Sequence, residues 1–342
     1  MKKRKLNWKL IFNISVIVFS IGLLVYFAVS ENGLNDLVKN ISSFDRGWLF
    51  MAVFCHLLNI FIDAYLIFIF TKSSANHYRL RDALKSCMVG QFFSAVTPGA
   101  SGGQPMQLIV MNKQNVDTGK ALSALMQKFL VYQTTITSYS ALSILVCYDF
   151  FKSNLDSFMW TLSIFGFCSQ AFVIALLLLF SFNKKITHTI LVYVFNLLAR
   201  IKIIKNPQEK INNLEEQLNS FHACNKELYK NKNLVLKTYV LTTVQLTCIF
   251  IVPYCIYRSF NLSGARVIDM VCAQAFVSMI SSFVPLPGAS GVSEGSFYIF
   301  FSMYYTAQTI KSAVLLWRII TYYFTIFLTA PFARLTKDKN KT

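Results

Sequence analysis

The chain has 342 residues, of which 55% are hydrophobic and only 14% are charged, and it contains 32 phenylalanines. This composition excludes an ordinary water-soluble domain and indicates a protein that crosses a membrane several times. The net charge of +18 is high enough to suggest nucleic acid. However, no basic stretch is interleaved with the aromatic or glycine motifs of nucleic-acid binders, so we expect no nucleic-acid partner.

Side chains suited to catalysis or metal binding are scattered along the chain. The eight cysteines form no CxxC pair and lie mostly in apolar runs, and the four histidines form no cluster. Such spacing predicts small packing residues and neither a disulfide framework nor a metal site. The chain also has no Walker loop and no Ser/His/Asp order, so we expect no catalytic residue and no cofactor.

Six apolar runs are long enough to span a bilayer, since about 20 residues cross a hydrocarbon core of roughly 30 Å. We predict full spans at 10–29, 48–70, 121–147, 158–182, 234–257 and 309–332. The first run lacks a signal-peptide cleavage site, so we expect it to be retained as a helix. The segment 149–156 is expected to be an outer loop.

The second run carries a polar stripe. His56, Asn59 and Asp63 fall at i, i+3 and i+7, which places them on one face of a helix. A polar stripe at membrane depth has to face protein or water. Two interpretations stay open, a functional ionisable site and a hydrogen-bonded seam between helices.

Two further apolar runs are each interrupted by the same loop. Pro98-Gly99-Ala100-Ser101-Gly102 recurs 189 positions later as Pro287-Gly288-Ala289-Ser290-Gly291. We therefore predict two broken elements, at 83–111 and 267–305. A backbone break at membrane depth is tolerated only where protein or a watery cavity surrounds it, and paired breaks in two halves of a transporter indicate a binding site. The alternative is a polar turn between ordinary helices, which the repetition of five residues disfavours.

The middle of the chain is less regular. The segment 186–204 is nearly long enough to span but contains basic residues, so we favour a helix at the inner interface. The segment 206–232 begins with Asn206 and Pro207, which is typical of a helix start, and is expected to be a cytosolic amphipathic linker helix. A recruitment site is the alternative role of this helix. The predicted division is thus a first membrane half at 1–205, the linker at 206–232 and a second membrane half at 233–342.

Charge fixes the expected orientation. With both termini in the cytoplasm, inside segments hold 25 of the 33 Lys and Arg residues and outside loops hold 6, as the positive-inside rule requires. The two remaining cations, Lys128 and Arg318, lie within spans. One broken element then opens inward and the other outward, so the expected fold is an all-α polytopic membrane protein with an inverted-topology repeat. The repeat extends to Lys128, Tyr132, Thr135 and Ile136, which align 190 positions before Arg318, Tyr322, Thr325 and Ile326.

The candidate substrate site combines the two loops with these cations. Exposed N–H groups where a helix begins again after a break, together with a cation, suit an anionic group. Its residues are Pro98, Gly99, Ser101, Gly102, Gln104, Lys128, Pro287, Gly288, Ser290, Gly291, Ser293, Glu294 and Arg318. The four glycines are expected to allow conformations and close approaches that a Cβ would obstruct. Asp63 and Glu294 are the expected partners of the two cations. Snorkelling of Lys128 and Arg318 to the interface is the alternative.

The loops at 98–105 and 285–294 resemble the paired signature of the lysylphosphatidylglycerol synthase transmembrane family. The resemblance covers nearly the whole chain. It implies a membrane domain that moves aminoacylated phosphatidylglycerol between leaflets and lowers susceptibility to cationic antimicrobial peptides. The sequence departs from the family at two points. It ends at Thr342, so we expect no cytosolic aminoacyltransferase domain, and Gln127-Lys128 stands where the family often has an acidic-basic pair.

We therefore expect a flippase-like protein of the cell membrane that translocates an anionic or aminoacylated phospholipid, and we expect no enzymatic activity. Three alternatives remain open. They are the phosphatidylglycerol lysyltransferase that the family name implies, a transporter of a polyprenyl-phosphate lipid, and a scaffold for a separately encoded synthase. The expected partner is a membrane phospholipid, with a separate synthase and a second copy of the chain as further candidates.

Overall fold

The computed structural model describes residues 44–154, 157–182, 189, 193, 230–282 and 284–336. Within these residues every regular element is helical, which agrees with the expected all-α class. The expected span at 10–29, and nearly all of the segments expected at 186–204 and 206–232, lie outside the described residues.

Five described stretches are long and apolar enough to cross a membrane. They are α3 (Arg46–Lys72), α6 (Thr118–Val146), most of α8 (Ser157–Phe182), α11 (Lys232–Phe250) with α12 (Val252–Ser259), and a last span that consists of α15 (Ile310–Arg318), η3 (Ile319–Tyr323), α16 (Phe324–Thr329) and η4 (Ala330–Thr336). They correspond to five of the six expected spans. The architecture is therefore that of a polytopic membrane protein.

Two of these spans are less regular than expected. The span expected at 234–257 is two helices, because α12 begins beside Pro253, which has no backbone N–H to continue the ladder of α11. The last span contains the π-helical turn η3 in its middle. The segment expected as a loop at 149–156 is instead largely the short helix α7 (Tyr148–Asn154). Burial of Phe151 against Phe276 explains that helix, since the contact anchors one of its faces in the core.

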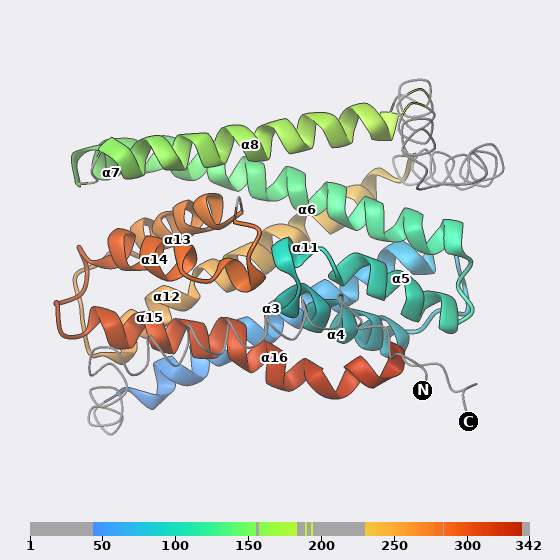
Figure 1. Cartoon of the computed structure of the whole chain (residues 1–342), viewed down its shortest axis with the longest axis horizontal. Helices are drawn as coiled ribbons and strands as arrows, with labels where there is room; N and C mark the ends of the chain where they lie inside the picture. Colours follow the sequence, from blue (N-terminus) through green and yellow to red (C-terminus); the bar gives the residue numbers. More distant parts are fainter. Residues whose placement is uncertain are drawn as a thin grey trace, which may run out of the picture.

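Each expected broken element is a pair of helices joined by a short 3-10 turn. The first pair is α4 (Leu80–Val96) and α5 (Gly103–Lys113), joined by η1 (Pro98–Ala100). The second is α13 (Val267–Ser281) and α14 (Val292–Phe301), joined by η2 (Pro287–Ala289). We call these pairs the first and second hairpins, and η1 and η2 their tips. The hairpins enter from opposite ends of the molecule, and their tips contact each other in its middle (Figure 1).

Small residues allow the first hairpin to close. A Cβ on Gly90 of α4 would collide with the side chain of Gln107 on α5, and a Cβ on Gly103 of α5 would collide with Ser94 on α4. Small residues at such contacts let two backbones approach closely inside a membrane. The two helices therefore pack directly against each other along the hairpin.

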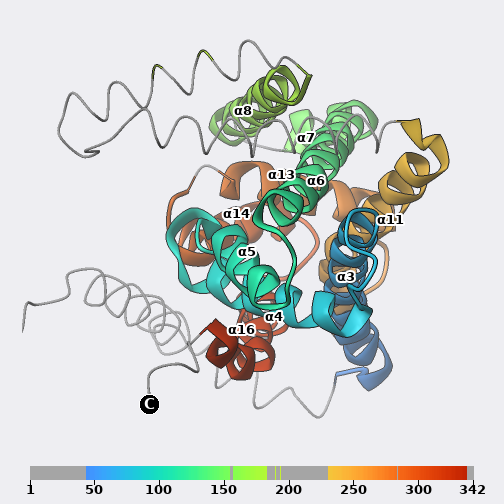
Figure 2. The same ribbon diagram turned by 90° about the vertical axis from the view of Figure 1, so that its right-hand side faces the viewer.

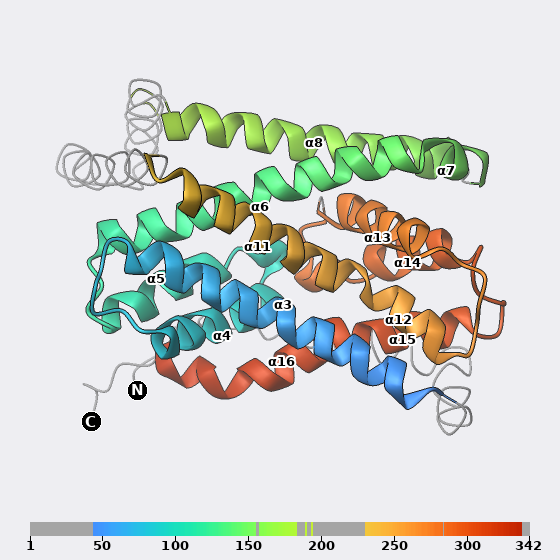
Figure 3. The same ribbon diagram turned by 180° about the vertical axis from the view of Figure 1, so that it is seen from behind.

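The spans surround the two hairpins. Viewed along the long axis, α3 and α11 lie on one side, the last span lies below, and α8 lies at the periphery beyond α6 (Figure 2). The view from behind shows α3 and α11 crossing the molecule between its two ends (Figure 3). Of the buried apolar clusters, the two large ones lie one around each hairpin. The second tip is largely buried, whereas Gly99 and Ala100 of the first tip are exposed.

We expect Gly166→Ala to destabilise the contact between α8 and α13. A Cβ on Gly166 would lie 2.9 Å from the backbone oxygen of Met279, and overpacking of this kind costs about 1–3 kcal/mol. The thermal unfolding midpoint in detergent should fall. Gly295→Ala is the matched control, because a Cβ at Gly295 meets no atom within 4 Å. Equal midpoints for the two variants would contradict this packing.

Candidate functional site

The two tips repeat one backbone conformation as well as one sequence. The residue before each proline is extended, with φ of −115° at Thr97 and −105° at Leu286. Gly99 and Gly288 then take left-handed φ angles of 56° and 58°, and the alanine that follows each is also left-handed. Glycine takes this conformation without the steric cost of a Cβ. The expectation for Gly99 and Gly288 is therefore confirmed.

The tips diverge at the glycine that ends each repeat. Gly102 has a φ of −80°, in the ordinary helical range, whereas Gly291 has a φ of 87°. Gly291 therefore meets the expectation through its backbone conformation, whereas the conformation of Gly102 is ordinary. Gly102 is instead restricted by close approach, since its Cβ would lie 2.7 Å from Cγ2 of Thr97.

The divergence follows from how the two equivalent N–H groups are satisfied. Gly102 N donates to Oγ1 of Thr97 at 2.8 Å, a residue that precedes the loop. Leu286 stands at the equivalent place in the second loop and has no hydroxyl. Gly291 N donates instead to Oε2 of Glu294 at 2.7 Å, a residue in the first turn of α14. A carboxylate at this position also suits the positive end of the helix dipole.

Glu294 links the second tip to the last span. Its Oε1 lies 2.8 Å from Nε of Arg318 in an ion pair, and Nη2 of Arg318 donates to the carbonyl of Gly288 at 2.9 Å. Both side chains are less than 10% exposed. Arg318 therefore does not snorkel to an interface, and it ties the last span to the tip.

The other cation is also paired. Lys128 Nζ lies 2.5 Å from Oδ1 of Asp63, whose side chain is buried. Asp63 further accepts hydrogen bonds from Gln91 Nε2 at 3.1 Å and Gln245 Nε2 at 3.4 Å. This one carboxylate on α3 thus contacts α4, α6 and α11. The two carboxylates expected as partners of the cations are confirmed in that role.

The polar stripe of α3 forms contacts between helices. Besides Asp63, Nε2 of His56 lies 2.8 Å from Oγ1 of Thr325 on α16, and both residues are buried. Asn59 is half-buried. These contacts support the interpretation of the stripe as a hydrogen-bonded seam.

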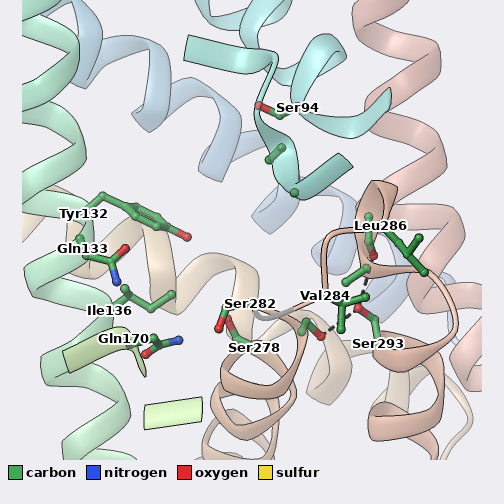
Figure 4. A pocket seen from close by; sticks show the side chains of 15 residues that line it. Ser94, Tyr132, Gln133, Ile136, Gln170, Ser278, Ser282, Val284, Leu286 and Ser293 are labelled. Atoms are coloured by element: carbon green, nitrogen blue, oxygen red, sulfur yellow. Dashed lines mark hydrogen bonds between the residues drawn. The ribbon is translucent and has the colours of Figure 1, made fainter. Parts of the chain in front are cut away.

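A cavity of about 360 Å³ lies where the tips meet α6, α8 and α13. Hydroxyl and amide groups lie among apolar side chains on its wall, and none of the described residues that line it is charged. The lining consists of Ser94, Gly99, Ala100, Tyr132, Gln133, Ile136, Gln170, Ser278, Ser281, Ser282, Val284, Leu286, Gly288, Ala289 and Ser293. Figure 4 shows the hydroxyl of Tyr132 and the amide of Gln170 directed into the space between α6 and α13. The arrangement offers hydroxyl and amide groups to a polar ligand.

Three of the residues proposed from the sequence line this cavity, namely Gly99, Gly288 and Ser293. The remaining ones are not among its lining residues, and they are Pro98, Ser101, Gly102, Gln104, Lys128, Pro287, Ser290, Gly291, Glu294, Arg318 and Asp63. Among them, Ser290 is buried and donates to the carbonyl of Pro287. The loops are thus at the cavity, whereas the ion pairs support the elements around it.

Sequence reasoning missed most of the cavity wall. The repeat aligns Tyr132 with Tyr322 but indicates no contact with a ligand for it or for Gln133, which follows it directly. Gln170 was a usable signal, because an amide in the apolar run at 158–182 needs a polar neighbour. The serines of α13 gave no signal, since serine hydroxyls in apolar helices usually bond to the preceding turn.

We expect Arg318→Ala and Glu294→Ala each to cost about 3–5 kcal/mol of stability, because each leaves a buried charge without its partner. The double variant should cost less than the sum of the two. Denaturant unfolding of the purified proteins in detergent measures all three values. Strictly additive losses would mean that the ion pair does not couple these residues.

Comparisons with known proteins agree with this architecture. The chain is 25% identical over 271 residues to a UPF0104 membrane protein of Archaeoglobus fulgidus, covering 76% of this chain and 77% of that protein. It is 22% identical over 339 residues to the uncharacterized protein MG306 of Mycoplasma genitalium, covering 91% and 84% of the two chains. The family model of the lysylphosphatidylglycerol synthase TM region matches residues 12–328. Together with the apolar helices, this match shows that the chain is an integral membrane protein of the lysylphosphatidylglycerol synthase transmembrane-region family.

Proposed function

We propose that this protein translocates a phospholipid, of the anionic or lysylated phosphatidylglycerol type, between the leaflets of the cell membrane. The observation that carries the proposal is a cavity lined by hydroxyl, amide and apolar groups, with no charge on its described lining residues, where two hairpin tips meet inside an apolar molecule. A lipid headgroup cannot cross hydrocarbon without losing its hydrogen bonds to water. The hydroxyls and amides of the cavity can replace those bonds while the acyl chains stay in the bilayer.

The absence of charge on the cavity wall also supports transport. Lys128 and Arg318 are each neutralised by a carboxylate within 2.8 Å. An anionic headgroup that enters the cavity therefore meets hydrogen-bonding groups without a free cation that would trap it. Movement of a lysylated lipid to the outer leaflet would lower the negative surface charge there, and with it the binding of cationic antimicrobial peptides.

The proposed transporter is built as an inverted-topology repeat of six full spans and two hairpins. At the end of the molecule where the first hairpin enters, the helix termini carry Lys72, Arg79, Lys113 and Lys120. A basic end of this kind faces the cytoplasm, so we assign both termini to that side. The sixth span is the one expected from the sequence at 10–29, outside the described residues.

The orientation predicts opposite labelling at the two ends of α6. Lys120→Cys at its start should be protected in intact cells from a membrane-impermeant maleimide, whereas Ser153→Cys in α7 should react. Both positions are exposed. The protein without an added cysteine supplies the background. Reaction of both positions from outside would contradict the proposed topology.

If the protein transports lipid as proposed, the transport rate should depend on Gly288. An alanine there strains a left-handed residue and drives its Cβ into the ring of Tyr322. In liposomes containing the purified protein and acyl-labelled phosphatidylglycerol or lysylphosphatidylglycerol, we expect the wild type to expose inner-leaflet lipid to a quencher. Gly288→Ala should slow this exposure by roughly ten-fold, since strain of about 1–2 kcal/mol and the collision with Tyr322 both fall on a tip at the cavity.

Gly264→Ala is the control for this experiment. Gly264 has a φ of 107°, but a Cβ there meets no atom within 4 Å and lies outside both hairpins. Its variant should therefore carry comparable strain and still transport. A wild-type protein that exposes no more lipid than empty liposomes would exclude the proposed function.

A further inference from the structure

Tyr322 in η3 closes the space between the tips on one side. Its hydroxyl donates to the carbonyl of Ala95, near the end of α4, at 2.9 Å. Its ring packs so closely on Gly288 that a Cβ there would collide with it. One side chain of the last span thus contacts both hairpins. The π-helical turn that presents it is a rare irregularity that occurs frequently at functional sites.

Tyr132 is the counterpart of Tyr322 in the first half. It follows Lys128 by four residues, as Tyr322 follows Arg318. The carbonyl of Ala95 stands three residues before the proline of the first loop, and Val284 stands three before the proline of the second. Gly99 is likewise the counterpart of Gly288. An equivalent contact would therefore join Tyr132 to Val284 and Gly99.

The structure has a cavity where that contact would be. Tyr132, Val284 and Gly99 all line it, and the Tyr132 hydroxyl is directed into the open space (Figure 4). A Cβ on Gly99 would have only the Cα of Pro285, at 3.9 Å, within 4 Å, so no ring packs on this glycine. One tyrosine is thus inserted between the tips and the other is withdrawn.

The ion pairs of the two cations show the same asymmetry as the two tyrosines. Arg318 holds the carbonyl of Gly288 and pairs with Glu294, both in the second hairpin. Lys128 pairs with Asp63, which belongs to α3 and to neither hairpin. The cation beside the inserted tyrosine therefore fixes its tip, whereas the cation beside the withdrawn tyrosine is held by a span.

We infer that Tyr132 and Tyr322 are paired positioning residues that close the two sides of the passage alternately. The inference rests on the proposed lipid transport. In the state seen here Tyr322 is inserted, and the headgroup occupies the place that Tyr132 has left, with the Tyr132 hydroxyl as one of its hydrogen-bonding partners. In the other state Tyr132 bonds to the carbonyl of Val284 and packs on Gly99, while Tyr322 releases Ala95 and Gly288.

Two conservative substitutions test this exchange, because they should change the labelling rate of one added cysteine in opposite directions. Ser282→Cys places a thiol on the cavity wall at an exposed position two residues from Val284. Its rate of reaction with a water-soluble maleimide is measured in nanodiscs, where both faces are accessible, after subtraction of the rate without the added cysteine. Tyr322→Phe removes the bond that holds the present state and should slow labelling. Tyr132→Phe removes the bond to Val284 that holds the other state and should speed labelling. Each loss of one hydrogen bond should shift the ratio of the two states by about five-fold.

Tyr139→Phe is the matched control, because Tyr139 lies two turns further along α6, where its hydroxyl is 3.5 Å from Thr247. It should leave labelling unchanged. Shifts of Tyr132→Phe and Tyr322→Phe in the same direction, or no shift in either, would overturn the inference. Lipid movement by the wild type without opposite shifts would reject the paired tyrosines and keep the transport function. Opposite shifts without lipid movement would reject the transport function and keep the pair.

Discussion

The structure depends on satisfying backbone groups where two helices are broken inside an apolar molecule. An unpaired N–H or C=O at this depth costs several kcal/mol, so each break needs its own partners. The equivalent N–H groups of Gly102 and Gly291 are both satisfied, one by the hydroxyl of Thr97 and the other by the carboxylate of Glu294. Once a carboxylate has this role it needs a cation, and Arg318 supplies it. The capping of one loop thus determines where the last span is attached.

This dependence changes the role of the charged residues. Ionisable groups in membrane spans are functional by default, and a direct grip of Lys128 and Arg318 on phosphate is the simplest form of that role. The geometry instead gives each cation a carboxylate, and it gives Arg318 a backbone carbonyl as well. These contacts fix the spans to one another and to the second hairpin. The hydroxyls and amides of the cavity wall are left to face a ligand. The function proposed for the cavity therefore rests on neutral hydrogen-bonding groups.

The hairpins and the charge partners could be predicted from the sequence because both depend on scarce residue types. A repeated Pro-Gly-Ala loop can break a helix wherever it occurs, and few carboxylates lie within apolar runs. The different conformation of Gly102 could not be predicted in this way. It depends on Thr97 in one loop and Leu286 in the other, outside the five repeated residues. The cavity wall also escaped prediction, because Gln133, Gln170 and Ser278 become neighbours only when α6, α8 and α13 pack around the tips.

The central claim is that a lipid headgroup occupies the cavity between the tips. Photocrosslinking with phosphatidylglycerol that carries a diazirine on its headgroup, followed by mass spectrometry of the adducts, tests it most directly. The account predicts adducts on the cavity wall, at Tyr132, Gln170 or Ser282, and their loss when unlabelled lipid competes. Adducts confined to exposed apolar positions such as Phe50 and Leu145 would place the headgroup outside the protein and contradict the account.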